Sequence, residues 1–325
     1  MQTNPLPLVL LTHKLPEDWI ASLSGKCRLL IGPIDATFLD RHLDAHIDEA
    51  IGLFTLLTIP VDTRLLQRAQ QLRVISNMAV GVDNIDISTC TKRKIPVGNT
   101  PGVLTEGTAD LTMGLLLSIA RRLPWAREDA IAGKWKTWSP TGWLGADLNG
   151  ATLGIIGFGK IGQAVAQRAQ GFGMRVVYTD PNRVGSNLGI HLSLSDLLHQ
   201  SDFVSLHVPL IKETYHLMDS SKLALMKKSA YLINASRGSV IDTEALFLAL
   251  VKGTIAGAAL DVTDPEPLPH DHPLYNLPNC LILPHIGSAT QNTRRKMAEL
   301  ACENLIAGLE GRRFPYCVNP EVYGI

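Results

Sequence analysis

The sequence predicts an α/β protein with two doubly wound parallel sheets. Its 325 residues are enough for about two domains. Its composition, 46% hydrophobic and only 18% charged, indicates large buried faces such as those of sheets covered on both sides. Short apolar runs alternate with helical patterns along the chain, and this alternation is typical of parallel strands joined by crossover helices.

Several classes of protein are not expected. Lys+Arg and Asp+Glu number 30 each, without a basic or acidic run, so we expect no nucleic-acid partner. No apolar stretch reaches the ~18 to 20 residues of a membrane span, and residues 6–11 lack the flanks of a signal peptide. Five scattered cysteines favour reduced thiols and a cytoplasmic location. His42 and His46 have metal-ligand spacing without an evident third ligand, so no metal site is expected.

The first hundred residues alternate between strand and helix patterns. Strands are predicted at 8–12, 28–31, 50–55, 74–78 and 95–98, with helical segments at 40–46 and 63–70. A long helix over 104–122 is apolar on nearly all sides, which predicts burial between two domains or in a subunit interface.

A second alternating series follows. Six strands are predicted at 153–156, 175–179, 203–206, 230–233, 255–260 and 281–283. With crossover helices, these strands complete a doubly wound dinucleotide-binding fold by about residue 284. Residues 289–309 predict a further helix, and residues 314–322 predict a non-helical tail. Because the second sheet is already complete, the chain end is expected to return to the first domain.

The glycine motif Gly157-Phe158-Gly159-Lys160-Ile161-Gly162 follows a predicted strand and opens a helical pattern, as a dinucleotide site requires. Gly157 permits a tight turn, Gly159 lets the backbone approach a pyrophosphate, and Gly162 allows close contact between helix and strand. The helix N-terminus presents N–H groups and partial positive charge to the phosphates, and Lys160 adds a further positive charge. A glycine turn without a ligand is the alternative interpretation.

Asp180 ends the next predicted strand, 18 residues beyond Gly162, where an acidic side chain binds the adenine-ribose hydroxyls. A carboxylate there repels a 2′-phosphate, so NAD(H) is favoured as cofactor over NADP(H). Arg183 lies close enough to weaken this preference, so NADP remains an alternative. A structural interpretation of Asp180 is that it caps the turn before Pro181.

Three polar residues, Arg237, Glu266 and His285, each follow a strand of the second series. Loops at the carboxyl ends of strands line the ligand crevice of a doubly wound sheet, so these side chains can converge near a nicotinamide. Each alone has a structural interpretation: a satisfied histidine, a solvated loop glutamate, and an arginine paired with Asp242. Their occurrence together after the glycine motif favours a catalytic set.

At this point the chain resembles the D-isomer-specific 2-hydroxyacid dehydrogenases over essentially its whole length. The segments that carry the resemblance are GFGKIG at 157–162, NASRG at 234–238, DVTDPEP at 261–267, LPHIGSAT at 283–290, AVGVDNID at 79–86 and NTPGVLT at 99–105. Within this family the chain is most similar to the glyoxylate/hydroxypyruvate reductase branch, through DVTDPEPLP, HIGSAT and WKTWSPTGWLG at 135–145.

The resemblance implies a Rossmann cofactor domain over residues 101–286. It also implies a flavodoxin-like, discontinuous substrate domain formed by residues 1–100 and 287–325. The implied reaction reduces a small 2-oxo acid, glyoxylate or hydroxypyruvate, with NAD(P)H to the D-2-hydroxy acid. Arg237 would bind the substrate carboxylate and carbonyl, His285 would be the acid/base, and Glu266 would be its partner.

The resemblance implies further binding residues. Backbone N–H groups of Val80 and Gly81 would hold the substrate carboxylate. Apart from the resemblance, we expect Leu57 and Met78 to form the wall of a small pocket. Further cofactor contacts are expected from Thr108, Val208, Pro209, Ala235, Asp261 and Gly287.

The tryptophan-rich segment predicts a homodimer. It contains Trp135, Trp138 and Trp143. In similar enzymes this region packs in the dimer and one Trp approaches the neighbouring active site, and we assign that role to Trp138. Aromatic burial in the interface is the simpler alternative.

Two other functions are consistent with parts of the sequence. A dinucleotide-sensing binding protein, like the corepressors of this fold, would need the glycine motif but not the three catalytic candidates. A sister dehydrogenase could act on formate, phosphite, 3-phosphoglycerate or 2-ketogluconate. The complete set of Arg237, Glu266 and His285 favours an enzyme, and the sequence leaves its acid open.

Overall fold

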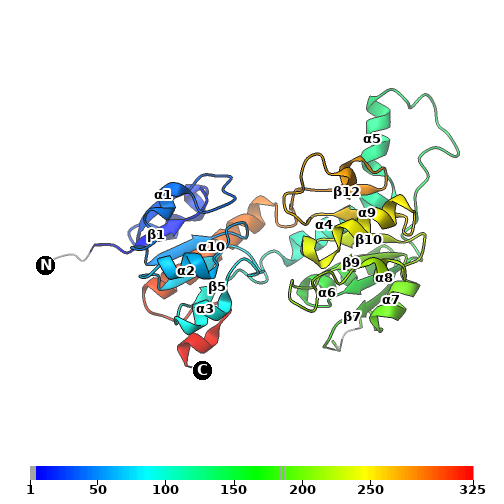
Figure 1. Cartoon of the computed structure of the whole chain (residues 1–325). Helices are drawn as coiled ribbons and strands as arrows, with labels where there is room; N and C mark the ends of the chain where they lie inside the picture. Colours follow the sequence, from blue (N-terminus) through cyan, green and yellow to red (C-terminus); the bar gives the residue numbers. More distant parts are fainter. Residues whose placement is uncertain (1–4, 183, 186, 325) are drawn as a thin grey trace. The chain divides into compact units, whose positions relative to one another are not determined.

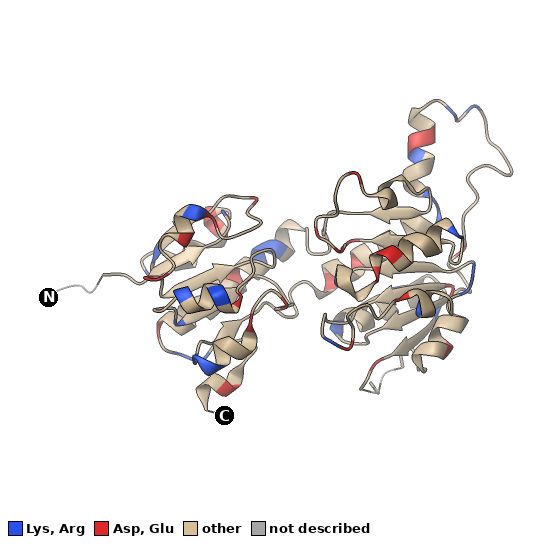
Figure 2. Ribbon diagram, in the orientation of Figure 1, with Lys and Arg blue, Asp and Glu red and all other residues tan. Residues whose placement is uncertain are grey.

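The computed structural model describes residues 5–182, 184–185 and 187–324 (Figure 1). The chain divides into two compact units. Unit 1 consists of the residues up to Leu104 together with those from Thr290, and unit 2 runs from Thr105 to Ala289. Each unit is built on one parallel sheet, which confirms the predicted fold class. Acidic and basic residues are interspersed over both units (Figure 2).

Unit 1 has the strand order β2-β1-β3-β4-β5, which is flavodoxin-like. Its strands are β1 (Leu8–Leu11), β2 (Arg28–Ile31), β3 (Gly52–Thr55), β4 (Val74–Asn77) and β5 (Val97–Gly98). Its helices are α1 (Arg41–Asp44), α2 (Thr63–Arg68), α3 (Ile87–Lys92) and α10 (Gln291–Leu309), with short 3-10 turns at Glu17–Trp19, Ala21–Leu23 and Pro320–Tyr323. The order of the strands reverses between β1 and β3, and ligands of such sheets bind at the carboxyl ends of the strands beside this point.

Local sequence explains where the helices of unit 1 begin. Asp40, Asp62 and Asp86 precede α1, α2 and α3, and each carboxylate accepts a backbone N–H of the first turn. Helix α10 lies against the sheet: the Ser76 hydroxyl of β4 donates to the Ala301 carbonyl at 2.7 Å. A Cβ at Gly98 would lie 2.8 Å from the Asn304 side chain, so only glycine permits this approach of β5 to α10.

Unit 2 has the strand order β12-β11-β10-β9-β6-β7-β8. Its strands are β6 (Thr152–Ile156), β7 (Arg175–Thr179), β8 (Ile190–His191), β9 (Phe203–Leu206), β10 (Tyr231–Asn234), β11 (Gly257–Leu260) and β12 (Cys280–Ile282). Its helices are α4 (Thr105–Ala120), α5 (Leu123–Ile131), α6 (Lys160–Gly171), α7 (Leu194–Gln200), α8 (Ser220–Leu223) and α9 (Thr243–Val251), with 3-10 turns at Gly238–Val240 and Pro273–Asn276. The order reverses between β6 and β9, so the expected ligand position lies where these two strands end.

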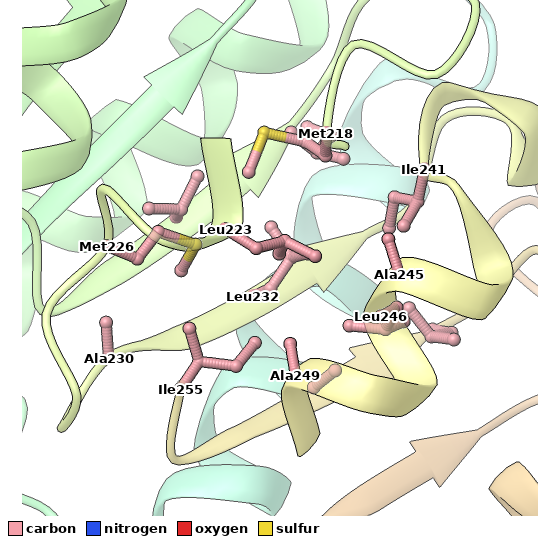
Figure 3. Close-up of a cluster of buried hydrophobic side chains, with 14 of the residues drawn as sticks. Met218, Leu223, Met226, Ala230, Leu232, Ile241, Ala245, Leu246, Ala249 and Ile255 are labelled. Carbon is pink, nitrogen blue, oxygen red and sulfur yellow. The ribbon is translucent and has the colours of Figure 1, made fainter. Parts of the chain in front are cut away.

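Both faces of the second sheet are covered. On one face, Leu232 of β10 packs with Ile241, Leu246 and Ala249 beside and within α9 (Figure 3). On the other face, α4 packs against α6 and the sheet. Much of the apolar surface of α4 is therefore buried within its own unit. No helix in the described residues is long and apolar enough to cross a membrane.

The structure corrects the predicted elements in four places. The sheet of unit 2 has seven strands in the described chain instead of six, because β8 adds an exposed edge strand of two residues beside β7. Helices α3 and α5 were not predicted. The last residues, predicted as non-helical, contain the 3-10 turn Pro320–Tyr323. Ahead of this turn, Cys317 forms an antiparallel bridge with Gly98 of β5.

One segment of unit 2 extends away from its sheet. Helix α5 and the chain that follows it to about residue 145 project from the body of the unit (Figure 1). Six large apolar side chains of this projecting arm are exposed: Leu123, Ile131, Trp135, Trp138, Trp143 and Leu144. An apolar cluster of this kind is typical of an interaction surface.

Candidate active site

The glycine loop between β6 and α6 has the backbone geometry that a dinucleotide needs. Gly157 has a φ of +91°, and a Cβ there would lie 2.6 Å from the His207 carbonyl oxygen. A Cβ at Gly162 would lie 2.2 Å from the Gly157 carbonyl oxygen, so glycine alone allows α6 this close to its strand. Nothing lies within 4 Å of the Cβ position of Gly159, which leaves its backbone accessible to a ligand.

The N-terminus of α6 begins directly at this loop. Gly159 is its N-cap, and no side chain caps the helix. The N–H groups of the first turn therefore remain available to bind an anion, which the partial positive potential of the helix end also attracts. Lys160 is exposed in the first turn and Ile161 is half-buried. These features fit the pyrophosphate of a dinucleotide.

Asp180 lies beside the glycine loop. Its Oδ2 accepts the Phe158 N–H at 2.8 Å, and its Oδ1 accepts the Asn182 N–H at 2.9 Å. The carboxylate thus places negative charge at the loop and also closes the turn around Pro181, so the two interpretations of Asp180 are compatible. Arg183 lies outside the described residues.

The loop after β9 lies on the other side of the strand-order reversal. The His207 N–H donates to the Ile156 carbonyl at 2.7 Å, and the imidazole Nε2 lies 2.8 Å from the Ser205 hydroxyl. Burial lowers the pKa of His207 to about 4. Val208 is half-buried and Pro209 is exposed. His207 was not among the predicted site residues, although its position directly after a strand was a signal that could have indicated it.

Glu266 and His285 are in direct contact at the carboxyl edge of the sheet. Oε1 of Glu266 lies 2.5 Å from Nδ1 of His285, and Oε2 accepts the Thr263 N–H at 3.3 Å. Both side chains are partly accessible, 25% for His285 and 33% for Glu266. An imidazole oriented by a carboxylate and open to solvent can exchange a proton with a ligand.

Asp261 fixes the turn that carries His285. Its backbone carbonyl accepts the His285 N–H at 2.9 Å. Its carboxylate, in a residue only 2% exposed, accepts the N–H groups of Ile286 at 2.7 Å and Gly287 at 2.8 Å. Burial raises the pKa of Asp261. The Thr108 hydroxyl donates to the Gly287 carbonyl at 3.4 Å, so Thr108, Asp261 and Gly287 form one cluster beneath His285.

Arg237 follows β10, the strand beside β11. Its Nη1 donates to the Ser236 carbonyl at 2.8 Å, and its own carbonyl accepts from Nδ2 of Asn234 at 2.8 Å. A Cβ at Gly238 would lie 1.8 Å from the Thr263 carbonyl oxygen, so glycine lets this loop pack on the loop that carries Glu266. Because β10, β11 and β12 are neighbours, the loops of Arg237, Glu266 and His285 share one edge.

Two other predicted positions in unit 2 have clear locations. Ala235 is half-buried in the loop of Arg237. Trp138 is 80% exposed on the projecting arm. Among the described residues, no three His, Cys, Asp or Glu side chains lie close enough to hold a metal ion.

The substrate candidates of unit 1 follow β3 and β4. The Val80 carbonyl accepts from Nδ2 of Asn99 at 2.8 Å, and the Gly81 carbonyl accepts from Nδ2 of Asn77 at 2.9 Å. In the described chain the N–H groups of Val80 and Gly81 donate no hydrogen bond, so they remain for an anion. Leu57 is half-buried in the turn after β3.

Met78 does not have the predicted position. It is 6% exposed and packs in the apolar core beneath α10. Side chains alternate between the faces of a strand and its extension, and this alternation places Met78 on the α10 side. The pocket wall predicted for it therefore does not include it.

A doubly wound sheet with a glycine loop at its strand-order reversal, and an imidazole–carboxylate pair at the same edge, defines a dinucleotide-dependent dehydrogenase. Comparison with known families agrees. The model of the D-isomer specific 2-hydroxyacid dehydrogenase NAD binding domain matches residues 113–287. The chain belongs to the D-isomer specific 2-hydroxyacid dehydrogenase family.

Individual relatives are similar over nearly the whole chain. A glyoxylate reductase of Korarchaeum cryptofilum is 46% identical over 321 residues, covering 97% of each chain. A crystal structure of a Thermus thermophilus protein has a TM-score of 0.90 at 47% identity, covering 96% of this chain and 99% of that one. The NADPH-dependent glyoxylate/hydroxypyruvate reductase of Sinorhizobium meliloti, solved with NADP and malonate, has a TM-score of 0.86 at 31% identity, covering 96% of both chains.

The predicted family and the predicted class of enzyme are confirmed by these comparisons. The chain is an NAD(P)-dependent oxidoreductase, rather than a binding protein of corepressor type. Unit 2 contains the whole of the matched NAD-binding domain, in which the glycine loop and Asp180 lie.

Proposed function

We propose that this enzyme reduces glyoxylate or hydroxypyruvate to the corresponding D-2-hydroxy acid, with NADH as preferred cofactor and NADPH as the alternative. The observation that carries the proposal is the 2.5 Å contact between His285 and Glu266, at the sheet edge that also holds Arg237. The names of the similar reductases support this choice of acids.

The catalytic roles follow from the chemistry of the three side chains. When bound, the nicotinamide supplies the hydride. His285 donates a proton from Nε2 to the carbonyl oxygen of the substrate, because Nδ1 is directed to Glu266. The Glu266 carboxylate stabilises the imidazolium form and fixes the plane of the ring. The Arg237 guanidinium binds the carboxylate and stabilises charge that develops on the oxygen.

Substrate binding in unit 1 is assigned to the loop after β4. The N–H groups of Val80 and Gly81 bind the carboxylate of the acid, since their carbonyls are already engaged by amide side chains. Leu57 limits the space for the substituent on the 2-oxo carbon. We therefore propose that glyoxylate and hydroxypyruvate are preferred over a phenyl-bearing acid.

Cofactor binding is assigned to the glycine loop and its neighbours in unit 2. The first turn of α6 binds the pyrophosphate, and Asp180 accepts from the ribose hydroxyls while repelling a 2′-phosphate. Contacts toward the nicotinamide end are assigned to Thr108, Ala235, Asp261 and Gly287, and those of the β9 loop to Val208 and Pro209.

We further propose a homodimer and a cytoplasmic location. The exposed apolar side chains of the projecting arm support an interface with a second copy, in which Trp138 approaches the neighbouring active site. All five cysteines lie in the described chain as free thiols, which supports a reducing compartment.

A steady-state assay with the His285→Ala variant tests the proton donor. We expect kcat for glyoxylate reduction, followed by NADH absorbance, to fall ~100-fold or more. His270→Ala, in an exposed turn, is the matched control and should keep the wild-type rate. A His285→Ala variant that keeps nearly the full rate would show that another group is the donor.

A substrate panel tests the choice of acid. Glyoxylate, hydroxypyruvate, pyruvate, 2-ketogluconate and phenylpyruvate are compared by kcat/KM with NADH and NADPH, with formate and phosphite oxidation measured in parallel. We expect glyoxylate or hydroxypyruvate to give the highest value. A clear preference for phenylpyruvate, or for formate or phosphite, would contradict the proposal.

A further inference from the structure

Two amide side chains link the loop after β3 to the loop after β4 in unit 1. Nδ2 of Asn84 donates to the Leu56 carbonyl at 3.1 Å and to the Ile59 carbonyl at 3.0 Å. Nδ2 of Asn77 donates to the Gly81 carbonyl at 2.9 Å and lies 3.4 Å from Oδ1 of Asn84. A continuous chain of amides therefore runs from Gly81 to the turn at 56–59.

Backbone hydrogen bonds tie the same two segments together. The Val61 N–H donates to the Asn84 carbonyl at 2.7 Å, and the Asp86 N–H donates to the Val61 carbonyl at 3.0 Å. The turn itself is closed by a bond from the Ile59 N–H to the Leu56 carbonyl at 3.3 Å. Asn84 thus holds the first and last carbonyls of the turn that carries Leu57.

Asn77 acts as a hydrogen-bond donor in this chain of amide side chains. It is fully buried, and in the described residues its Oδ1 has no hydrogen-bond partner. A buried amide with an unsatisfied oxygen is costly, so the value of Asn77 lies in the bonds that its nitrogen donates to Gly81 and Asn84, both in the loop after β4. The bond to Gly81 holds its carbonyl in place. The Gly81 N–H then remains available to donate a hydrogen bond to the substrate.

We propose that Asn84 is a positioning residue that determines substrate size. It sets the distance between Leu57, which limits the substituent of the 2-oxo acid, and the N–H groups of Val80 and Gly81, which bind its carboxylate. Asn84 itself touches no substrate. This inference rests on the proposed function of the Val80–Gly81 loop, and it deepens that function by naming the residue that sets the pocket's dimensions.

The position of the two loops supports this role. Leu57 follows β3, one of the two strands at the strand-order reversal of unit 1, and Val80 and Gly81 follow its neighbour β4. Ligands of flavodoxin-like sheets bind at the carboxyl ends of strands beside this reversal. A hydrogen-bonded link between the two loops therefore acts at the place where this sheet type binds ligands.

Asn84→Ala tests the proposal, because it removes both donated bonds and leaves the backbone unchanged. We expect KM for glyoxylate to rise about tenfold and the kcat/KM preference for glyoxylate over phenylpyruvate to fall about tenfold. The Kd of NADH, measured by fluorescence, should stay unchanged, because the cofactor site lies in unit 2. Asn84→Asp, which has nearly the same shape but faces two carbonyls with a carboxylate, should show the same losses.

Asn319→Ala is the matched control for a loss of stability in unit 1. Asn319 is also fully buried, and its Nδ2 donates to the Ile95 carbonyl and the Thr91 hydroxyl, both at 3.0 Å. It has no hydrogen bond to either of the two loops. This variant should lose stability to urea and keep the wild-type preference between the two acids.

A double-mutant cycle with Leu57→Ala shows whether Asn84 acts through Leu57. If it does, the double variant should lose little more preference than Leu57→Ala alone, so the two effects are not additive. Independent, additive effects would overturn the proposed route.

The outcomes separate this inference from the proposed function. If the wild type reduces glyoxylate, and Asn84→Ala keeps both its KM and its preference, the positioning role is wrong and the proposed function stands. If both Asn84 variants behave like Asn319→Ala, the role of Asn84 is structural only. A wild type that reduces none of the 2-oxo acids contradicts the proposed function itself.

Discussion

His285 is held in a backbone conformation that a histidine rarely adopts. Its φ is +52°, in the left-handed region, which costs of order 1 to 3 kcal/mol for a residue other than glycine. The hydrogen bonds of Asp261 to residues 285, 286 and 287 offset this cost and fix the turn. The left-handed backbone conformation therefore sets the direction of the imidazole. Asp261 acts on the site by holding the backbone of His285 in this conformation.

His207 predicts a specific response of the fold to acid. Burial lowers its pKa from 6.5 to about 4, so at neutral pH the imidazole is enclosed without charge. The unfolded chain binds this proton below pH ~6.5, while the folded chain binds it only near pH 4. Folding stability should consequently decrease as pH falls through this window, by at most ~1.4 kcal/mol per pH unit for one proton.

His207→Gln tests this dependence, because glutamine stays neutral and still offers an N–H to Ser205. We expect the urea midpoint of the wild type to fall more steeply between pH 6.5 and pH 4.5 than that of the variant. His199→Gln, at an exposed position in α7, should follow the wild type. Parallel curves for the wild type and His207→Gln would contradict the assignment. His13, whose pKa burial also lowers, is present in all three proteins and cancels in the comparison.

At the scale of elements, α6 depends on glycine at its third position. A Cβ at Gly162 would lie 2.2 Å from the Gly157 carbonyl oxygen, so Gly162→Ala forces the helix away from the glycine loop. We expect the variant to bind NADH at least ~10-fold more weakly, because the first-turn N–H groups move with the helix. Isothermal titration with NADH measures this effect.

Gly171→Ala is the control for glycine replacement in the same helix. Gly171 is the last residue of α6, and nothing lies within 4 Å of its Cβ position. This variant should bind NADH as the wild type does and should unfold no more easily, because alanine has the higher helix propensity. Equal NADH affinity of the two variants would show that the close approach at Gly162 has no role in binding.

Elements were predictable wherever burial imposed a pattern on the sequence. Strands such as β6 and β9 are buried along nearly their whole length and are mostly apolar, because helices cover both faces of a parallel sheet. Strand β8 is two exposed residues, and its only signal is the pairing with β7, which sequence does not reveal. Helix α5 has no buried residue and therefore no apolar stripe.

The candidate site was predictable where side chains follow strands. Position after a strand indicated Glu266 and His285, and the glycine spacing indicated the loop of α6. The amide chain through Asn84 was not predictable, since its side chain bonds to carbonyls 25 and 28 residues earlier. Such contacts depend on tertiary packing and leave no local pattern in the sequence.

At the scale of the whole molecule, each unit brings its candidate residues to the carboxyl edge of its own sheet. Unit 1 places Leu57 and the Val80–Gly81 loop there, and unit 2 places the glycine loop and the His285–Glu266 pair there. The same topological rule thus accounts for the positions of the proposed substrate loop in one unit and the proposed cofactor loop in the other. Neither edge explains the exposed apolar side chains of the projecting arm.

We expect a second copy of the chain to cover that arm, and sedimentation equilibrium tests this. Leu144 is 67% exposed and Ile131 is 69% exposed, so Leu144→Glu and Ile131→Glu should shift the wild-type dimer toward monomer by placing charge in an apolar interface. Val251→Glu, at an exposed apolar position of α9, should leave the dimer intact. A wild type that sediments as a monomer at all concentrations would contradict the proposed assembly.

Trp138→Ala separates the two roles considered for the arm's aromatic side chains. If Trp138 approaches the neighbouring active site, the variant should remain dimeric and its KM for glyoxylate should rise several-fold, because a wall of the pocket is lost. If Trp138 only buries apolar surface, the variant should dissociate more readily. Its KM, measured at a protein concentration high enough to keep the enzyme fully dimeric, should then match that of the wild type. Measuring KM across protein concentrations distinguishes these results, since only the second depends on the dimer–monomer equilibrium.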